Sequence, residues 1–374
     1  MIRQGRRGAR IRLSAALSAA AALLIPAASE ATIYAPPGQP GPALSLPQAE
    51  LDAALTCTGG VAGASRAPVL LVPGTAENPK SEFSWSWEPA LTKVGVPWCA
   101  VALPNDATGD IQTSAEYVVS AIRTMYSRAG RRIAIVGHSQ GGMLPRWVLR
   151  FWPDTRAMVD DLVGLAPSNH GTLSAIPFCQ TPCPASFRQQ TAGSEFTKAL
   201  NSYQETFPGI SYTVVYTHTD EVVTPNSDDS GSSPVHGGGG EIANVAIQQV
   251  CPLDLNEHLG VGSHDPVAYA LAIDAIGHAG PAEPSRISSS VCNQTLMPGV
   301  NPVTFPANEA AFSASIASAI ANADQVSSEP PLRCYVTASC PSSAAATAHA
   351  KRPKKCRKGK HRKHRKCRKK HKKK

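Results

Sequence analysis

A serine lies at the centre of a short stretch that combines small and polar residues. The stretch reads Gly137-His138-Ser139-Gln140-Gly141 and directly follows the apolar run at residues 133–136. Residues 143–151 are compatible with a helix. A G-x-S-x-G sequence between a strand and a helix is typical of a tight turn that exposes a serine hydroxyl above a sheet. We therefore expect Ser139 to be the nucleophile of an acyl-transfer reaction.

An activated serine also needs a histidine as base and a carboxylate that orients the histidine. With this kind of turn, the acid follows the serine along the chain and the histidine follows the acid. Asp220 comes at the end of an apolar run and is the candidate acid, and His258 and His264 are the two candidate bases. The other acids nearby fit less well, because one is expected to point away and the others lie in a loop-like segment: Glu221, Asp228 and Asp229.

The elements that must position these residues follow from the hydrophobic pattern. Buried-strand runs are expected at residues 69–72, 96–103, 133–136, 162–166, 212–216 and 243–250. Helical spacing is found at residues 113–127 and an Ala-rich helix is expected at 308–323, whereas 32–50 reads as an extended arm and 230–240 as a loop. Strands that alternate with helices predict an α/β fold with a doubly wound, mostly parallel sheet and helices on both faces.

The two ends of the chain differ from its body. Residues 1–31 contain five arginines before a short apolar stretch at 13–25, which is typical of a secretory signal peptide and too short to span a membrane. We therefore expect a secreted protein that is extracellular or associated with the cell envelope. Residues 32–340 are expected to form one catalytic domain, and 341–350 a linker.

Residues 351–374 form a polybasic tail. The tail holds 17 Lys or Arg and no acidic residue, whereas residues 32–350 carry a net charge of −12, so the overall charge of +9 belongs mostly to the tail. A disordered charge run is the simplest interpretation, and adhesion to an anionic envelope surface is the alternative. Nucleic acid is not an expected partner of an exported chain.

Several segments together resemble one known family of α/β-hydrolases. They are residues 71–75, 139–142, 189–191, 220–225 and 257–260. They are similar, in this order, to segments of Candida antarctica lipase B and its bacterial relatives, and the resemblance runs from about residue 56 to residue 340. It implies an α/β-hydrolase fold with Ser139, Asp220 and His258 as catalytic residues. His264 is then expected at the surface or in a supporting position.

The same resemblance implies how the substrate is held. The oxyanion hole would be formed by the backbone N–H of Gln140 and by the N–H and hydroxyl of Thr75. The pocket residues would be His138, Gln190, Val222 and Val223. His138 stands where the yeast enzyme has a tryptophan, although Gly-His-Ser is common among other bacterial lipases, so the stereochemical preference of the family is not carried over. As a rival base His138 would have poor geometry next to Ser139, and a packing role is expected instead.

Ten cysteines in an exported chain indicate disulfide bonds. Three pairs correspond to disulfides of the resembled family: Cys57–Cys99, Cys251–Cys292 and Cys334–Cys340. The C-x3-C pair Cys179 and Cys183 lies in a Pro-rich segment near the expected site, and we expect a bridge that stiffens the rim.

These features predict a secreted serine hydrolase, a triacylglycerol lipase or carboxylesterase, that acts on a lipid or other ester. A cutinase-like polyester depolymerase is an alternative with the same site architecture. An envelope-binding protein with an inert hydrolase body and a functional basic tail is an alternative of another class. The mechanism requires no metal or organic cofactor, and we expect a monomer.

Overall fold

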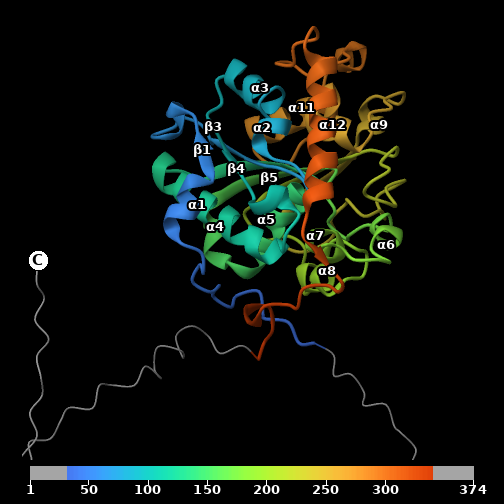
Figure 1. Ribbon diagram of the computed structural model, residues 1–374. Helices are drawn as coiled ribbons and strands as arrows, with labels where there is room; N and C mark the ends of the chain where they lie inside the picture. The colour runs from blue at the N-terminus through green and yellow to red at the C-terminus, as the bar shows by residue number, and fades with distance from the viewer. Residues whose placement is uncertain (1–31, 340–374) are drawn as a thin grey trace, which may run out of the picture. The chain divides into compact units, whose positions relative to one another are not determined.

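A seven-stranded sheet organises the described part of the chain, which is residues 32–339 of a computed structural model (Figure 1). The strands are β1 (Leu55–Cys57), β2 (Val69–Val72), β3 (Trp98–Val101), β4 (Ile133–His138), β5 (Val159–Leu165), β7 (Ser211–Tyr216) and β8 (Glu241–Ala246). Their order across the sheet is β1-β3-β2-β4-β5-β7-β8. Only β1 is antiparallel to its neighbour in this sheet, and the carboxyl ends of the six parallel strands therefore meet at one edge.

The helices cover both faces of this sheet. They are α1 (Gln48–Ala53), α2 (Pro79–Glu82), α3 (Trp87–Lys93), α4 (Ile111–Ala129), α5 (Gln140–Phe151), α6 (Ala175–Phe178), α7 (Ala185–Gln189), α8 (Glu195–Leu200), α9 (Ile247–Val250), α10 (His258–Ser263), α11 (Pro266–Gly277) and α12 (Phe305–Asn322). Short 3-10 helices lie at Gly59–Val61, Pro104–Ala107, Pro153–Met158, Pro284–Arg286, Ser289–Asn293 and Cys334–Val336. A small second sheet pairs β6 (Cys183–Pro184) with β9 (Gln325–Val326).

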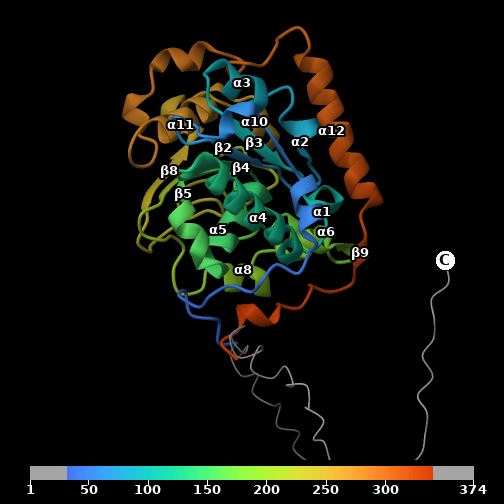
Figure 2. The same ribbon diagram turned by 90° about the vertical axis from the view of Figure 1, so that its left-hand side faces the viewer.

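The alternation of side chains along the central strands creates two hydrophobic cores. In β2, Leu70 and Val72 pack into the core that contains the buried faces of α4 and α5, which lie next to each other in Figure 2. Val69 and Leu71 point the other way, into the core that contains α3 and α11. Strands buried on both faces must be apolar throughout, which explains the continuous apolar runs in the sequence. The predicted α/β fold, with a mostly parallel sheet and helices on both faces, is confirmed.

Local signals determine where the longest predicted elements begin and end. The side chain of Asp110 accepts a hydrogen bond from the N–H of Gln112 and caps α4, and Gly130 ends that helix with a φ of 66°. The helix predicted at 308–323 is present as α12, which begins at Phe305 because Pro306 suits the first turn of a helix.

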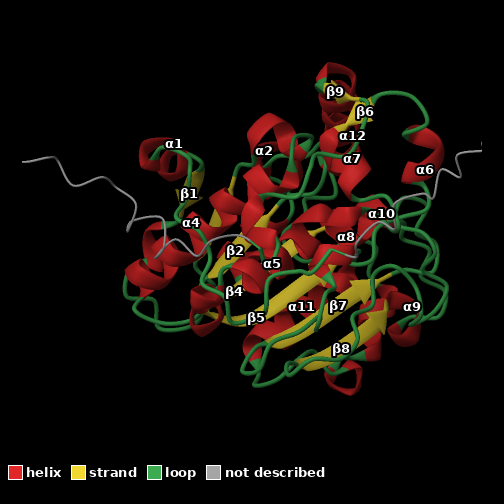
Figure 3. Cartoon of the chain, turned by 90° about the horizontal axis from the view of Figure 1, so that it is seen from below, coloured by secondary structure: helices red, strands yellow, loops and turns green. Residues whose placement is uncertain are grey.

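Two expectations about secondary structure were wrong in part, and one strand was missed. The arm at 32–50 is not extended throughout, because α1 begins at Gln48. The strand expected at 243–250 ends at Ala246, and residues Ile247–Val250 form α9. The short edge strand β1 was not predicted; Figure 3 shows it in the sheet, and its pairing with β3 is a tertiary contact.

The predicted signal peptide, linker and basic tail lie outside the described residues, as does Cys340. In the part of the chain that is described, none of the helices has both the length and the apolar character needed to cross a lipid bilayer.

Candidate active site

Ser139 occupies a strained turn between β4 and α5. Its backbone has φ 52° and ψ −122°, a region that residues with a side chain rarely adopt. The turn brings β4, β2 and α5 so close together that a Cβ on Gly137 would lie 2.0 Å from the carbonyl oxygen of Gly141. A Cβ on Gly141 would lie 2.1 Å from the carbonyl oxygen of Val72. The two glycines of the pentapeptide are therefore required by steric contact.

Asp220 and His258 come from two loops at the carboxyl edge of the sheet. The Asp220 carboxylate accepts N–H hydrogen bonds from Val222 and Val223 at 3.0 and 2.7 Å. Its other oxygen lies 3.1 Å from Nδ1 of His258. Burial by itself would raise the pKa of Asp220, but the neighbouring imidazole and the two N–H donors outweigh it and lower this pKa. Asp220 is therefore held as a carboxylate that can orient His258.

The loop that precedes His258 is fixed to the segment between β7 and Asp220. The hydroxyls of Thr217 and Thr219 both donate to the backbone carbonyl of Asn256, at 2.8 and 2.9 Å. His258 is the first residue of α10, and Glu257 caps that helix by accepting N–H groups of Leu259 and Gly260. These contacts determine where the imidazole lies relative to Asp220.

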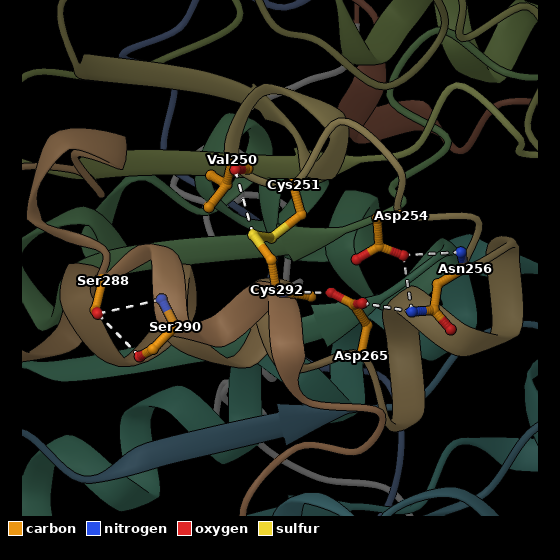
Figure 4. The surroundings of a disulfide bond; sticks show 9 residues. Val250, Cys251, Asp254, Asn256, Asp265, Ser288, Ser290 and Cys292 are labelled. Carbon is orange, nitrogen blue, oxygen red and sulfur yellow. Dashed lines mark hydrogen bonds between the residues drawn. A yellow bond between two sulfur atoms is a disulfide. The ribbon is translucent and has the colours of Figure 1, made fainter.

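A disulfide bond anchors the start of the same loop. Cys251 follows α9 and is bonded to Cys292, as Figure 4 shows. Next to the bond, the side-chain amide of Asn256 donates to Asp254 at 2.9 Å and to Asp265 at 2.6 Å. The segment between Cys251 and Asp265, which carries His258, is thereby held by the disulfide bond at one end and by the hydrogen bond to Asp265 at the other.

Ser139 and His258 both line a cavity of about 310 Å³. Thr75, Gln190, Val222 and Val223 line it too, as the sequence predicts. Most of the remaining wall is apolar and includes Ala175, Phe178, Phe187, Leu259, Ile316 and Ile320. The last two come from α12, which lies along one side of the domain in Figure 1. An apolar cavity with a few polar groups is typical of a small-molecule site.

A chain of hydrogen bonds connects the residues of the expected oxyanion hole. Gln190 donates from Nε2 to the hydroxyl of Thr75 at 2.8 Å and to Oε1 of Gln140 at 3.1 Å. The Thr75 hydroxyl donates to the same Gln140 oxygen at 3.1 Å. Ser168 donates to Oε1 of Gln190 at 2.7 Å, which fixes the orientation of this amide. The role of Ser168 was not predicted, since it lies in a loop with no motif of its own.

His138 is not a pocket residue, and this expectation was wrong. Its side chain is fully buried and lies behind the site, with its ring centroid 4.8 Å from that of His258. Glu77 and Glu82 contact the ring, and neither carboxylate was predicted. His264, expected at the surface or in support, is buried against Phe305 with ring centroids 4.8 Å apart.

Three predicted disulfide bonds are present, and they are Cys57–Cys99, Cys179–Cys183 and Cys251–Cys292. Cys334 is disulfide-bonded, and its predicted partner Cys340 lies outside the described residues. The Cys179–Cys183 bridge follows Phe178 at the mouth of the cavity, where the Phe178 side chain is 55% exposed.

One group of side chains in residues 32–339 has donor atoms close enough to suggest a metal site. The group is Glu77, Glu82 and His138, with one donor atom from each within 4.8 Å of the others. The same atoms contact one another: Nδ1 of His138 lies 3.0 Å from Glu77 and 3.2 Å from Glu82. We therefore interpret the group as hydrogen-bonded and not as a set of metal ligands.

Comparison with known proteins agrees with this architecture. The fold and the serine turn define the chain as an α/β-hydrolase, and residues 107–251 match the family model described as Lipase (class 2). Within that superfamily, the chain is similar to lipase B and related lipases. It is 36% identical over 227 residues to lipase B of Pseudozyma antarctica, a match that covers 60% of this chain and 66% of the relative.

Solved structures give the same result. The crystal structure of Aspergillus fumigatus lipase B superposes with a TM-score of 0.72 at 27% sequence identity. That match covers 79% of this chain and 74% of the other. The α/β domain of this chain is thus similar in fold to that of a fungal lipase B.

Proposed function

We propose that this protein hydrolyses carboxylic esters, as a lipase or carboxylesterase, through an acyl-enzyme on Ser139. The observation that carries the proposal is that Ser139, on its strained turn, and His258 line the same apolar cavity. The His258 ring is hydrogen-bonded to the Asp220 carboxylate. The similarity to lipases supports the choice of esters over other acyl compounds.

In this mechanism, Nε2 of neutral His258 takes the proton of the Ser139 hydroxyl as the oxygen attacks the ester carbonyl. Asp220 holds the Nδ1 proton of His258 and stabilises the imidazolium that forms. His258 then gives the proton to the leaving alcohol, and water repeats the sequence on the acyl-enzyme. Every step uses a side chain that this chain supplies.

The negative charge on the carbonyl oxygen would be stabilised by the backbone N–H of Gln140 and by Thr75. The Thr75 hydroxyl donates to Gln140 in the free protein and would have to rotate toward the substrate to take part. Gln190 donates to the Thr75 oxygen and so leaves its hydroxyl proton available for that rotation. Loss of one such donor typically lowers turnover by about 10²–10³-fold.

Export of the protein is part of the proposal. Two of its disulfides, Cys57–Cys99 and Cys251–Cys292, join residues 42 and 41 positions apart. Such bonds form and persist in oxidising compartments outside the cytosol. This supports the secreted location predicted from residues 1–31.

The test is hydrolysis of p-nitrophenyl esters with acyl chains from short to long by the mature chain, with Ser139→Ala and the surface control Ser285→Ala. We expect activity in the wild type and the control and its loss in Ser139→Ala. A fluorophosphonate should attach its phosphonyl group to Ser139 of the wild type, with loss of fluoride, and should not label Ser139→Ala. Equal labelling of both, or no activity on any ester, would overturn the proposal, and the chain-length profile separates an esterase from a lipase.

A further inference from the structure

Three buried ionisable side chains meet at the back of the candidate site, and one of them, Glu77, also lines the cavity. Glu77 follows the Thr75 turn, Glu82 ends α2, and His138 is the last residue of β4 and precedes Ser139. Their exposed fractions are 2%, 0% and 0%. We call these three residues the buried cluster. Burial of three ionisable groups is costly unless they compensate one another, so the arrangement needs a physical explanation.

The protons of the cluster follow from its geometry. Nε2 of His138 lies 3.1 Å from the backbone carbonyl oxygen of His258, which can only accept, so this nitrogen carries a proton. Nδ1 faces Glu77 at 3.0 Å and Glu82 at 3.2 Å. A proton on Nδ1 as well makes the ring an imidazolium between two acids, and a single carboxylate then neutralises it.

Glu77 is the better candidate for that carboxylate. Its Oε2 atom also accepts the backbone N–H of Gly74 at 2.8 Å, whereas neither oxygen of Glu82 has a hydrogen-bond donor other than within the cluster. Burial would raise the pKa of Glu77, but the imidazolium lowers it overall. Burial and the adjacent Glu77 charge raise the pKa of Glu82 well above its usual range, which favours a proton there. Burial opposes the charge on His138, but the two acids raise its pKa well above the usual value.

The cluster contacts each of the segments that the reaction would need. Through Gly74 it holds the turn that carries Thr75, and through β4 it is continuous with Ser139. Through the carbonyl and the ring of His258 it contacts the base. There is no spare room, because a Cβ on Gly262 would lie within 2.5 Å of three atoms of the His138 ring.

We propose that His138 is a positioning residue for ester hydrolysis, held as an imidazolium by the Glu77 carboxylate, and that it keeps the Thr75 turn and His258 aligned with Ser139. The inference rests on the proposed function of this site. The proposal assigns different roles to the two acids that contact the His138 ring. Glu77 supplies the negative charge, and Glu82 is the neutral acid.

A pair of isosteric substitutions tests this difference. Glu82→Gln replaces a neutral acid by a neutral amide, whereas Glu77→Gln removes the charge opposite His138. We expect Glu77→Gln to lower kcat at least tenfold more than Glu82→Gln does, with KM changed by less than about threefold in both, because a small misplacement of reacting groups can cost about 10²-fold in rate. The exposed Glu241→Gln serves as a control for the substitution itself.

A spectroscopic readout tests the protonation without relying on activity. In protein labelled with ¹⁵N-histidine, we expect one buried imidazole with both nitrogens protonated at every pH from 5 to 9, and its signals should shift in Glu82→Gln. Circular dichroism of each variant separates loss of folding from loss of alignment.

Three results would overturn the proposal. The first is an equal kcat for Glu77→Gln and Glu82→Gln, and the second is a neutral His138 ring between pH 5 and 9. The third is one equivalent of divalent metal bound by the wild type and not by Glu82→Gln. If the wild type hydrolyses no ester, the proposed function fails, and the NMR experiment still decides whether His138 is an imidazolium.

Discussion

Acid should destabilise this protein through one buried histidine, His264. The residue directly follows α10 and is only 7% exposed, and its ring packs edge-on against Phe305. Its Nδ1 atom lies 3.0 Å from the hydroxyl of Ser263. Burial disfavours the charged ring and outweighs the opposing effect of the Asp254 carboxylate, which lowers the pKa of His264 to about 4.

This shift makes the free energy of unfolding depend on pH. In the unfolded chain the same imidazole titrates near a pKa of 6.5, so the unfolded state binds the extra proton first as the pH falls. The contribution of His264 to stability is complete above pH 6.5 and is lost progressively between pH 6.5 and 4. A difference of about 2.5 pKa units corresponds to a loss of about 2.5 kcal/mol between pH 7.5 and pH 4.5.

The assay is urea denaturation with the disulfides intact, at pH 7.5 and pH 4.5, on the wild type and His264→Gln. The variant should be less stable at pH 7.5 because it loses the packing against Phe305. Between the two pH values, however, it should lose about 2–3 kcal/mol less than the wild type does. Effects of the substitution that do not depend on pH cancel in this comparison.

The matched control is His218→Gln, which removes an exposed imidazole. This variant should follow the pH dependence of the wild type. If wild type and His264→Gln lose stability in parallel, within about 0.5 kcal/mol, the assignment of acid sensitivity to the buried ring is wrong.

Three further predictions concern the reaction and the fold. Asp220→Asn should lower kcat by about 10⁴-fold in steady-state ester hydrolysis while the far-UV circular dichroism stays the same, and a loss below tenfold would contradict the orienting role. Replacing Cys57 and Cys99 by Ala should lower the free energy of unfolding in urea by about 4 kcal/mol, because the bridge closes a 42-residue separation, and an unchanged midpoint would contradict this estimate. Gly141→Ala should give insoluble or unfolded protein, because its Cβ would meet the Val72 carbonyl oxygen at 2.1 Å, so a soluble and active variant would show that the turn can widen.

The parts of the structure that could be predicted from sequence depend on local signals. The strand, glycines and helix around Ser139 are adjacent in the chain, and the order of serine, acid and histidine restricted the search to a few residues. The apolar runs identified the central strands because a strand that is covered on both faces has no polar side. Each of these inferences needed only neighbours in the sequence.

What could not be predicted depends on contacts between distant segments. Glu77 and Glu82 lie close together in the sequence, in the loop before α2 and at the end of α2, but nothing there indicates that His138 of β4 is near. His138 was expected in the pocket because the residue at this position lines it in the resembled family, but here the side chain is fully buried. β1 is too short to be recognised without β3 beside it, and α9 follows β8 without a break in the apolar pattern.

The first and last described segments lie side by side. Tyr34 and Thr337 form an antiparallel bridge, and the backbone N–H of Ala35 donates to the carbonyl of Val336 at 2.8 Å. Arg150, in the last turn of α5, donates to the carbonyl of Ala35. Since α5 begins directly after Ser139 and has 12 residues, this meeting point lies about 18 Å along the helix from the nucleophile.

The domain is therefore suited to circular permutation. A short peptide could join its ends, and new termini could be opened in the exposed Ser/Gly-rich loop near residue 238. A surface tether attached close to Tyr34 or Thr337 would leave from the same place, about one helix length away from the serine. Immobilisation at this place should thus leave the entrance to the cavity free.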